Sequence, residues 1–198
     1  MEYRFLLAPL ALGLLLPPIA VPWVVVDFLG HHTYSPLDIV GELSPRNATD
    51  NTLNQNQNQY LLLDLTSTYR GVSSAFVFST IVYLISIPAI IASIVWKKHR
   101  AKIALIAGIM AITAGLGWVY SVQSFKGHFA QEAASTGGLI GQEWKGQENT
   151  IVNGIIIMGT GHYFVILAGI IAILAYVVEK VYRKQEPPLG TATNKEQK

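Results

Sequence analysis

The stretch "IALIAGIMAITAGLGWVYSV", residues 103–122, contains no Asp, Glu, Lys or Arg. A helix needs about 20 apolar residues to cross the hydrocarbon of a bilayer, which is roughly 30 Å thick. Buried helices of a large soluble protein are the alternative, but they require a polar shell that a chain of 198 residues does not supply. The stretch therefore predicts a transmembrane helix.

Three further blocks without a charged side chain lie at residues 5–26, 72–96 and 151–178. Only 13% of all residues are charged, whereas a typical soluble domain has about 25%. The four blocks predict an all-α membrane protein, a bundle of four transmembrane helices in one domain over residues 1–185. Residues 186–198, which are mostly polar, are expected to form a disordered cytoplasmic tail.

The first block differs from the others because it contains prolines at positions 9, 17, 18 and 22. A secretory signal peptide is the alternative, since Arg4 precedes the block and small residues lie near Ala20. The apolar run is, however, longer than the roughly 7–15 residues of a signal core. We therefore expect a span whose regular helix is kinked or ends before Pro17, followed by an extended segment around "PPIAVPW" (17–23).

Basic residues are distributed unevenly between the two sides of these spans. Ten of the fourteen Lys and Arg residues lie at the N-terminus, in the turn "KKHRAK" (97–102) or after residue 178, and eight of the twelve acidic residues lie on the other side. Because Lys and Arg collect in cytoplasmic loops, we predict a multi-pass protein of the plasma membrane with cytoplasmic termini and extracellular loops at 27–71 and 123–150. The net charge of +2 gives no indication of a nucleic-acid partner.

The first external loop carries the amide-rich tract "NATDNTLNQNQNQY" at residues 47–60. Asn47 begins an N-x-[ST] pattern, which predicts glycosylation of an exposed loop at the cell surface. On either side, "PLDIVGEL" (36–43) and "YLLLDLTSTY" (60–69) predict two short strands of a small antiparallel sheet that rests on the outer helix ends. The second loop is expected to contain a short helix around residues 128–135 and then irregular chain.

In its predicted topology the chain resembles the claudin-like group of four-span membrane proteins over nearly its whole length. "VPWVVVDF" (21–28) is similar to the aromatic opening of that group's first extracellular strand, and "GTGHYFVILAGIIAIL" (159–174) is similar to the glycine-plus-aromatic entry of span four in many small tetraspans. The resemblance implies cytoplasmic termini and a long first external loop that carries strands. The group's Gly-Leu-Trp triplet and paired loop cysteines are missing, so tight-junction function is not transferred.

Small residues recur at four-residue spacing within the predicted spans, and such rows let helix backbones approach closely in lipid. They predict helix-packing positions at Ala104, Gly108, Ala111, Gly115, Ala168 and Ala172. The spacing leaves open whether these rows serve the internal bundle or a neighbouring subunit. Aromatic residues near the span ends are expected to be interfacial anchors: Trp23, Trp96, Tyr120, Tyr163 and Tyr176.

Candidate metal or haem ligands are mainly histidines, because the chain has no cysteine. Four histidines lie in the external loops or near the outer end of span four: His31, His32, His128 and His162. Imidazoles near one membrane face can bind zinc or copper, or ligate a haem. No His-x-x-x-His or Glu-x-x-His spacing occurs on a predicted helix, so we expect no metal site and no cofactor.

The predicted spans contain no ionisable group of the kind on which proton relays and ion-coupled transporters usually rely, apart from His162. No nucleophile, metal-binding or phosphate-binding motif of an enzyme is present. We therefore expect a non-enzymatic structural or accessory subunit that binds itself or other membrane proteins through its loops and helix faces. The alternative is a small subunit of a respiratory or oxidase complex, with a haem, transition metal or quinone near the external histidines.

Overall fold

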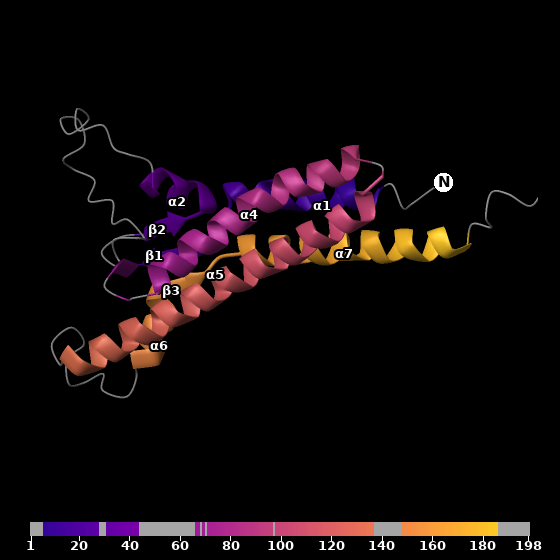
Figure 1. Cartoon of the computed structure of the whole chain (residues 1–198). Helices are drawn as coiled ribbons and strands as arrows, with labels where there is room; N and C mark the ends of the chain where they lie inside the picture. The colour runs from indigo at the N-terminus through magenta and orange to yellow at the C-terminus, as the bar shows by residue number, and fades with distance from the viewer. Residues whose placement is uncertain are drawn as a thin grey trace, which may run out of the picture.

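Three long helices lie side by side and give the molecule its elongated shape (Figure 1). They are α4 (Val72–Val95), α5 (Arg100–Thr136) and α7 (Gly161–Gln185), and each is long and apolar enough to cross a membrane. The computed structural model describes residues 6–27, 31–43, 66, 67, 69, 71–96, 98–136 and 148–185. A mostly helical chain with a small sheet agrees with the predicted fold class at this level, while the count of four spans stays a prediction.

The first apolar block, predicted as a span over residues 5–26, is not one continuous helix. It forms helix α1 (Leu7–Leu15), the 3-10 turn η2 (Pro17–Ile19) and then strand β1 (Val24–Asp27). Helix α1 ends at Leu15, which confirms the prediction that the regular helix ends before Pro17. The helix does not continue because prolines donate no backbone hydrogen bond. Helix α1 packs mainly on α7 and runs beside it in the opposite direction, toward the sheet (Figure 1).

Two aromatic side chains satisfy the backbone where this block stops being helical. The Leu15 carbonyl lacks a helical partner, because Pro18 has no N–H and the Ile19 N–H bonds elsewhere. The Tyr83 hydroxyl on α4 donates a hydrogen bond to this carbonyl, and the Trp23 indole N–H donates to the Pro18 carbonyl at 2.7 Å. These polar groups at the break are thereby satisfied within the protein, as is required wherever water is absent.

Replacing Tyr83 with phenylalanine should lower the free energy of unfolding by about 1–3 kcal/mol, because the buried Leu15 carbonyl then loses its partner. Thermal or denaturant unfolding in detergent micelles measures the loss. Tyr120→Phe is the matched control, since Tyr120 is 65% exposed and its substitution should change stability by less than about 0.5 kcal/mol. Equal losses in the two variants would contradict the role assigned to the Tyr83 hydroxyl.

A three-stranded antiparallel sheet closes one end of the bundle, with the strand order β2–β1–β3 (Figure 1). Strands β2 (His31–Tyr34) and β3 (Ile156–Met158) pair with opposite edges of β1, so that Val24 is opposite Tyr34 on one side and Met158 on the other. A small sheet was predicted, but its strands are not the predicted ones. The central strand comes from the end of the first apolar block, and β3 comes from within the fourth.

The fourth apolar block, predicted as one span over residues 151–178, is divided in the structure. Helix α6 (Glu148–Ile155) and strand β3 precede α7, which begins only at Gly161. The isoleucines of β3 are β-branched and favour extended chain. At Gly159 an added Cβ would collide with the backbone of Pro22, so glycine allows β3 to end against the segment that leads into β1.

Residues 36–43, predicted as a strand, instead form helix α2 (Pro36–Leu43). Its start is capped by Ser35 and Asp38, whose carboxylate accepts hydrogen bonds from the Ser35 N–H at 2.6 Å and the Ser35 hydroxyl at 2.7 Å. Proline at the first helical position completes a pattern that favours helix initiation. The prediction of a strand was wrong because it was based on the apolar residues of this segment and did not consider the helix cap.

The remaining expectations concern the loops and the C-terminal tail. Most of the strand predicted over 60–69 lies outside the described residues, while Thr66 and Ser67 are helical. Residues 137–147, for which irregular chain was predicted, and the predicted tail 186–198 also lie outside the described residues. The helix expected around 128–135 is present, but it is the continuation of α5. At 1.5 Å per residue α5 is about 55 Å long, which is much more than the roughly 30 Å thickness of a hydrocarbon core.

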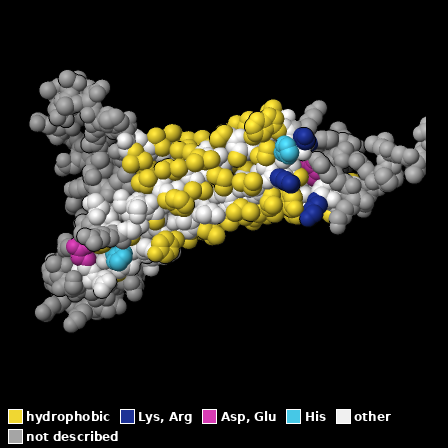
Figure 2. Space-filling view, viewed as in Figure 1, with side chains coloured by type: hydrophobic (Ala, Val, Ile, Leu, Met, Phe, Trp, Pro, Cys, Tyr) yellow, Lys and Arg dark blue, Asp and Glu magenta, His cyan; other side chains and the backbone are white. Residues whose placement is uncertain are grey.

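On the face shown in Figure 2, a band of mainly apolar side chains runs along the bundle, and Lys and Arg side chains gather at one end of this apolar band. That end is where α4 meets α5 and α7 finishes, and the charged residues of the described ranges there are Lys98, Arg100, Lys102, Glu179, Lys180, Arg183 and Lys184. The charged residues of the described ranges toward the sheet end are Asp27, Asp38, Glu42, Lys126, Glu132 and Glu148. Charges are thus sorted to the two ends of the bundle, mainly basic at one and mainly acidic at the other.

Candidate functional site

Helices α5 and α7 approach each other closely at a pair of glycines. A Cβ atom added to Gly108 would lie 2.7 Å from the Gly169 carbonyl oxygen, and one added to Gly169 would lie 2.7 Å from the Gly108 carbonyl oxygen. Because the obstacle on each side is backbone, neither position accommodates a methyl group unless a helix moves. Close backbone approach of this kind holds helices together in lipid, where no hydrophobic effect between helices assists.

The other predicted packing positions also face neighbouring helices of the same chain. The four alanines are almost fully buried: Ala104, Ala111, Ala168 and Ala172. At Gly115 an added Cβ would lie 2.5 Å from the Ile166 side chain on α7. Two glycines that contact a neighbouring helix were not predicted: Gly169, and Gly117, which packs against the Ser79 side chain of α4. The spacing of small residues within one helix does not reveal such glycines, because the atoms that a Cβ would meet belong to the neighbouring helix.

A cluster of aromatic rings fills the sheet end of the bundle. Trp23 lies edge-on to Tyr83 and to Trp118, with ring centroids 5.1 and 4.9 Å apart. Phe76 makes a further edge-on contact with Trp118 at 4.9 Å. All four side chains are buried, and Gly161 leaves room for the Trp23 indole at the start of α7. The cluster therefore joins the first block to all three long helices.

The prediction that Trp23 is an interfacial anchor is thus wrong, since its side chain is 0% exposed. Its place near the end of an apolar block had suggested an anchor, whereas the chain turns at the prolines and carries the ring into the core. Three other predicted anchors are exposed, as their proposed role requires: Trp96, Tyr120 and Tyr163.

The four candidate histidine ligands occupy different parts of the structure. His31 and His32 lie on β2, and the His31 Nδ1 is 2.5 Å from the carboxylate at the end of β1. His128 lies on the distal part of α5, where its ring stacks on Tyr69 with centroids 5.2 Å apart. His162 is buried at the start of α7. Within the described ranges, no three His, Asp or Glu side chains are grouped as metal ligands would be.

His162 differs from the other histidines because its side chain is enclosed. It is 1% exposed, its ring lies against Tyr163, and its Nε2 has no hydrogen-bond partner in the described part of the chain. The indole nitrogen of Trp118 is likewise buried without a described partner. An unpaired buried polar atom costs about 1–3 kcal/mol, so a water molecule or ligand atom that paired with either nitrogen would be stabilised there.

The turn before α4 is tied to the distal part of α5. The Tyr69 hydroxyl donates a hydrogen bond to the Glu132 carboxylate, and the Tyr69 ring contacts Phe125 as well as His128. Burial raises the pKa of the Tyr69 phenol well above its usual range, and the hydrogen bond to Glu132 and the charge of that carboxylate raise it further. At physiological pH the Tyr69 phenol therefore keeps its proton and donates it in the hydrogen bond to Glu132.

The Tyr69 phenol should titrate at clearly higher pH than an exposed tyrosine, whose pKa is about 10. Because the folded protein holds this proton more tightly than the unfolded chain, the contribution of Tyr69 to stability is complete below about pH 10 and declines above it. Subtracting an ultraviolet titration of the Tyr69→Phe variant from that of the wild type isolates this phenol. A difference curve with an ordinary tyrosine midpoint would contradict both the burial of this phenol and its bond to Glu132.

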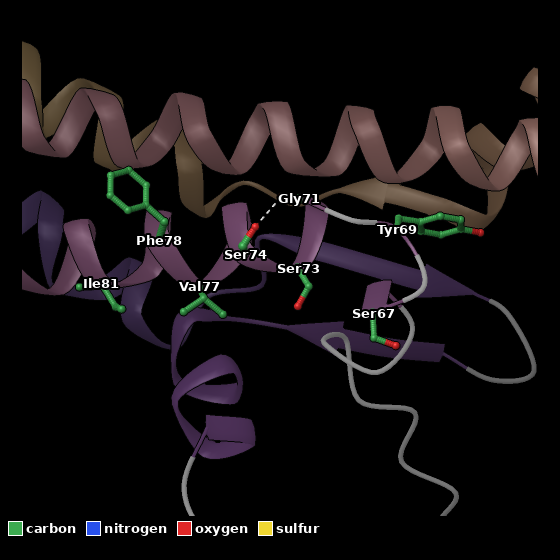
Figure 3. A pocket seen from close by; sticks show the side chains of 8 residues that line it. All are labelled: Ser67, Tyr69, Gly71, Ser73, Ser74, Val77, Phe78 and Ile81. Atoms are coloured by element: carbon green, nitrogen blue, oxygen red, sulfur yellow. Dashed lines mark hydrogen bonds between the residues drawn. The ribbon is translucent and has the colours of Figure 1, made fainter.

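A shallow groove runs along the start of α4 (Figure 3). Hydroxyl groups line its end near the turn before the helix, and apolar side chains line it further along. Its lining consists of Ser67, Tyr69, Gly71, Ser73, Ser74, Val77, Phe78 and Ile81. Gly71 has φ of 91°, a conformation that favours glycine, and its carbonyl accepts a hydrogen bond from the Ser74 hydroxyl at 3.1 Å. The groove offers polar contacts at one end and an apolar surface at the other.

The predicted glycosylation site, Asn47, lies outside the described residues. The features that the structure does bring together are the glycine contacts, the aromatic cluster around Trp23 and the polar links at the sheet end.

In comparisons with known proteins, no family model matches this chain, and no curated protein matches it in sequence.

Proposed function

We propose that this chain is a multi-pass protein of the plasma membrane with a structural or accessory role, not a catalytic one. The outward faces of the three long helices carry this proposal. Within their most apolar windows, only 33% of the residues of α4, 39% of α5 and 28% of α7 are buried inside the protein. The rest of these windows is also largely apolar, so lipid is the environment in which such a surface is stable.

Large apolar side chains are exposed on every one of these helices. Phe78 on α4 is 60% exposed, Leu116 on α5 is 54% exposed and Leu174 on α7 is 48% exposed. Soluble proteins rarely expose contiguous apolar patches larger than a few hundred Å². An apolar band shared by three adjacent helices, as in Figure 2, is typical of contact with lipid chains.

The use of polar side chains inside the bundle favours a structural role over transport. Four hydroxyl groups donate hydrogen bonds to carbonyls of their own helices over 2.6–2.9 Å: Thr80, Ser86, Ser93 and Ser121. Hydroxyls bonded in this way satisfy themselves locally and need no water-filled path. Small residues then let the helices pack without charged groups between them.

In the proposed orientation the basic end faces the cytoplasm and the sheet end faces outward. The first apolar block provides the fourth crossing, as a short helix followed by a turn and extended chain. The sheet, α2 and the distal part of α5 then belong to the external side with loops 27–71 and 123–150. There, and along the lipid-facing helix rows, the chain would bind other membrane proteins or a second copy of itself.

Cross-linking in native membranes, followed by native mass spectrometry in mild detergent, tests the assembly role. A homo-oligomer or a stable complex with another membrane protein is expected. A strictly monomeric protein without partners in both experiments would contradict the role. A chain that stays in solution without detergent would contradict the membrane location itself.

A second candidate function is a small subunit of a respiratory or oxidase complex that holds a haem, a transition metal or a quinone. One observation favours it, the buried His162 Nε2 that lacks a described hydrogen-bond partner. Visible absorbance and metal analysis of the purified protein distinguish the two functions. A coloured or metal-bearing sample that loses the signal in His162→Gln would favour the redox subunit, and a colourless, metal-free sample would count against it.

A further inference from the structure

A hollow lies at the end of the bundle opposite the sheet, in the turn between α4 and α5. It is lined by Val95, Trp96, Lys98 and His99. Val95 and Trp96 are 67% and 64% exposed and continue the apolar surface of α4, whereas Lys98 and His99 follow them in the turn. An apolar wall and a rim that carries the Lys98 ammonium group therefore meet at the edge of the apolar band.

The basic residues of this turn differ in their partners. Arg100 has partners within the protein, since its Nε donates to the Ser93 carbonyl near the end of α4 at 3.3 Å and the residue makes a further interaction. Lys98 makes no hydrogen bond or ion pair with any residue that the structure describes. The first turn of α5 contains Arg100 and Lys102 but no acidic residue, although a helix start already carries partial positive charge. An anion placed beside the turn would compensate the charge of Lys98.

We propose that this hollow binds an anionic phospholipid, with the phosphate beside Lys98 and His99 and the acyl chains along Val95 and Trp96. Charge complementarity selects an anion, because basic residues at the end of a membrane helix attract acidic headgroups. The apolar wall selects a lipid over a free phosphate, because it is continuous with the surface that faces lipid chains. This site rests on the membrane location proposed above.

Lipid titration of the purified full-length protein in mild detergent, read by native mass spectrometry, tests the site. Phosphatidylglycerol should bind more tightly than phosphatidylcholine, and added salt should reduce the preference. Lys98→Gln should weaken phosphatidylglycerol binding about fivefold. Lys126→Gln, which removes a charge toward the sheet end, is the matched control and should leave this binding unchanged.

Equal binding of the two lipids would overturn the site, and so would equal weakening by Lys98→Gln and Lys126→Gln. Glycerol phosphate that bound as tightly as phosphatidylglycerol would show an ordinary phosphate site instead of a lipid site. These outcomes are separable from failure of the proposed function. A protein that inserts into bilayers normally yet shows no lipid preference loses only this site, whereas one that never enters a bilayer contradicts the proposed function as well.

Discussion

Replacing Trp23 with alanine is expected to lower the free energy of unfolding by about 3–5 kcal/mol, the range for removing a fully buried large aromatic ring. The indole contacts Tyr83 and Trp118 edge-on, and its N–H donates to the Pro18 carbonyl at the helix break. Its loss would leave a cavity where the first block meets the long helices, and would also leave that carbonyl without this donor. Denaturant titration in detergent micelles, followed by circular dichroism, measures the change.

Trp96→Ala is the matched control, because this indole is 64% exposed at the other end of α4. Its removal should change stability by less than about 1 kcal/mol, as for most surface substitutions. Trp23→Phe separates packing from hydrogen bonding, since it keeps a ring but loses the N–H. If Trp23→Ala were no more damaging than Trp96→Ala, the first block would not be packed into the bundle as the structure has it.

The second large effect is expected at the glycine contact between α5 and α7. Gly108→Ala places a methyl group 2.7 Å from the Gly169 carbonyl oxygen. A backbone atom cannot relieve this overlap by a change of rotamer, as a side chain could. The helices must separate or shift, at a cost of about 1–3 kcal/mol. The same denaturant titration measures the loss, and Gly169→Ala should produce a similar one.

Gly127→Ala provides a control on the same helix with the opposite expected sign. An added Cβ at Gly127 meets no atom within 4 Å, so alanine should be neutral or should stabilise the helix by up to about 1 kcal/mol. A loss at position 108 together with no loss at 127 isolates the close approach. Equal effects at both positions would mean that helix propensity alone decides, and that α5 and α7 are not packed through Gly108.

The long helices could be predicted from composition because the requirement for a lipid-facing helix is local. Residues 72–96 were predicted as a span and α4 covers Val72–Val95, while α5 contains the whole of 103–122. The end of α1 before Pro17 could be predicted for the same reason, since a proline lacks an N–H wherever it lies. In each case the deciding property belongs to the residues themselves.

The sheet could not be predicted in the same way, because its strands pair across long stretches of chain. Strand β1 is paired with β3 about 130 positions later, and both lie in apolar blocks that are hard to tell from helix by periodicity. The short runs of isoleucine and valine were therefore placed within predicted spans, although residues 21–28 were also compared with the opening of an extracellular strand. The capped start of α2, in contrast, was a local signal in residues 35–38 that the prediction of a strand overlooked.

The site residues likewise include some that local sequence identifies and others that depend on how the helices pack. Small-residue rows identified Gly108, but its partner Gly169 depends on how two helices cross. The enclosure of His162 and Trp118 depends on the same packing, so neither could be told from an interfacial residue by its position in the chain. Their unpaired nitrogens become visible only once the neighbouring elements are in place.

Cysteine accessibility tests the proposed membrane crossing most directly, because the natural chain contains no cysteine. Single cysteines at Ile109 and Leu167, which are 51% and 46% exposed on the apolar band, should resist a membrane-impermeant maleimide until detergent is added. Gln131→Cys should react in intact cells, and Lys98→Cys should react only after permeabilisation. Rapid labelling at 109 or 167 without detergent, or labelling of 98 and 131 from the same side, would contradict helices that cross the bilayer with the sheet outside.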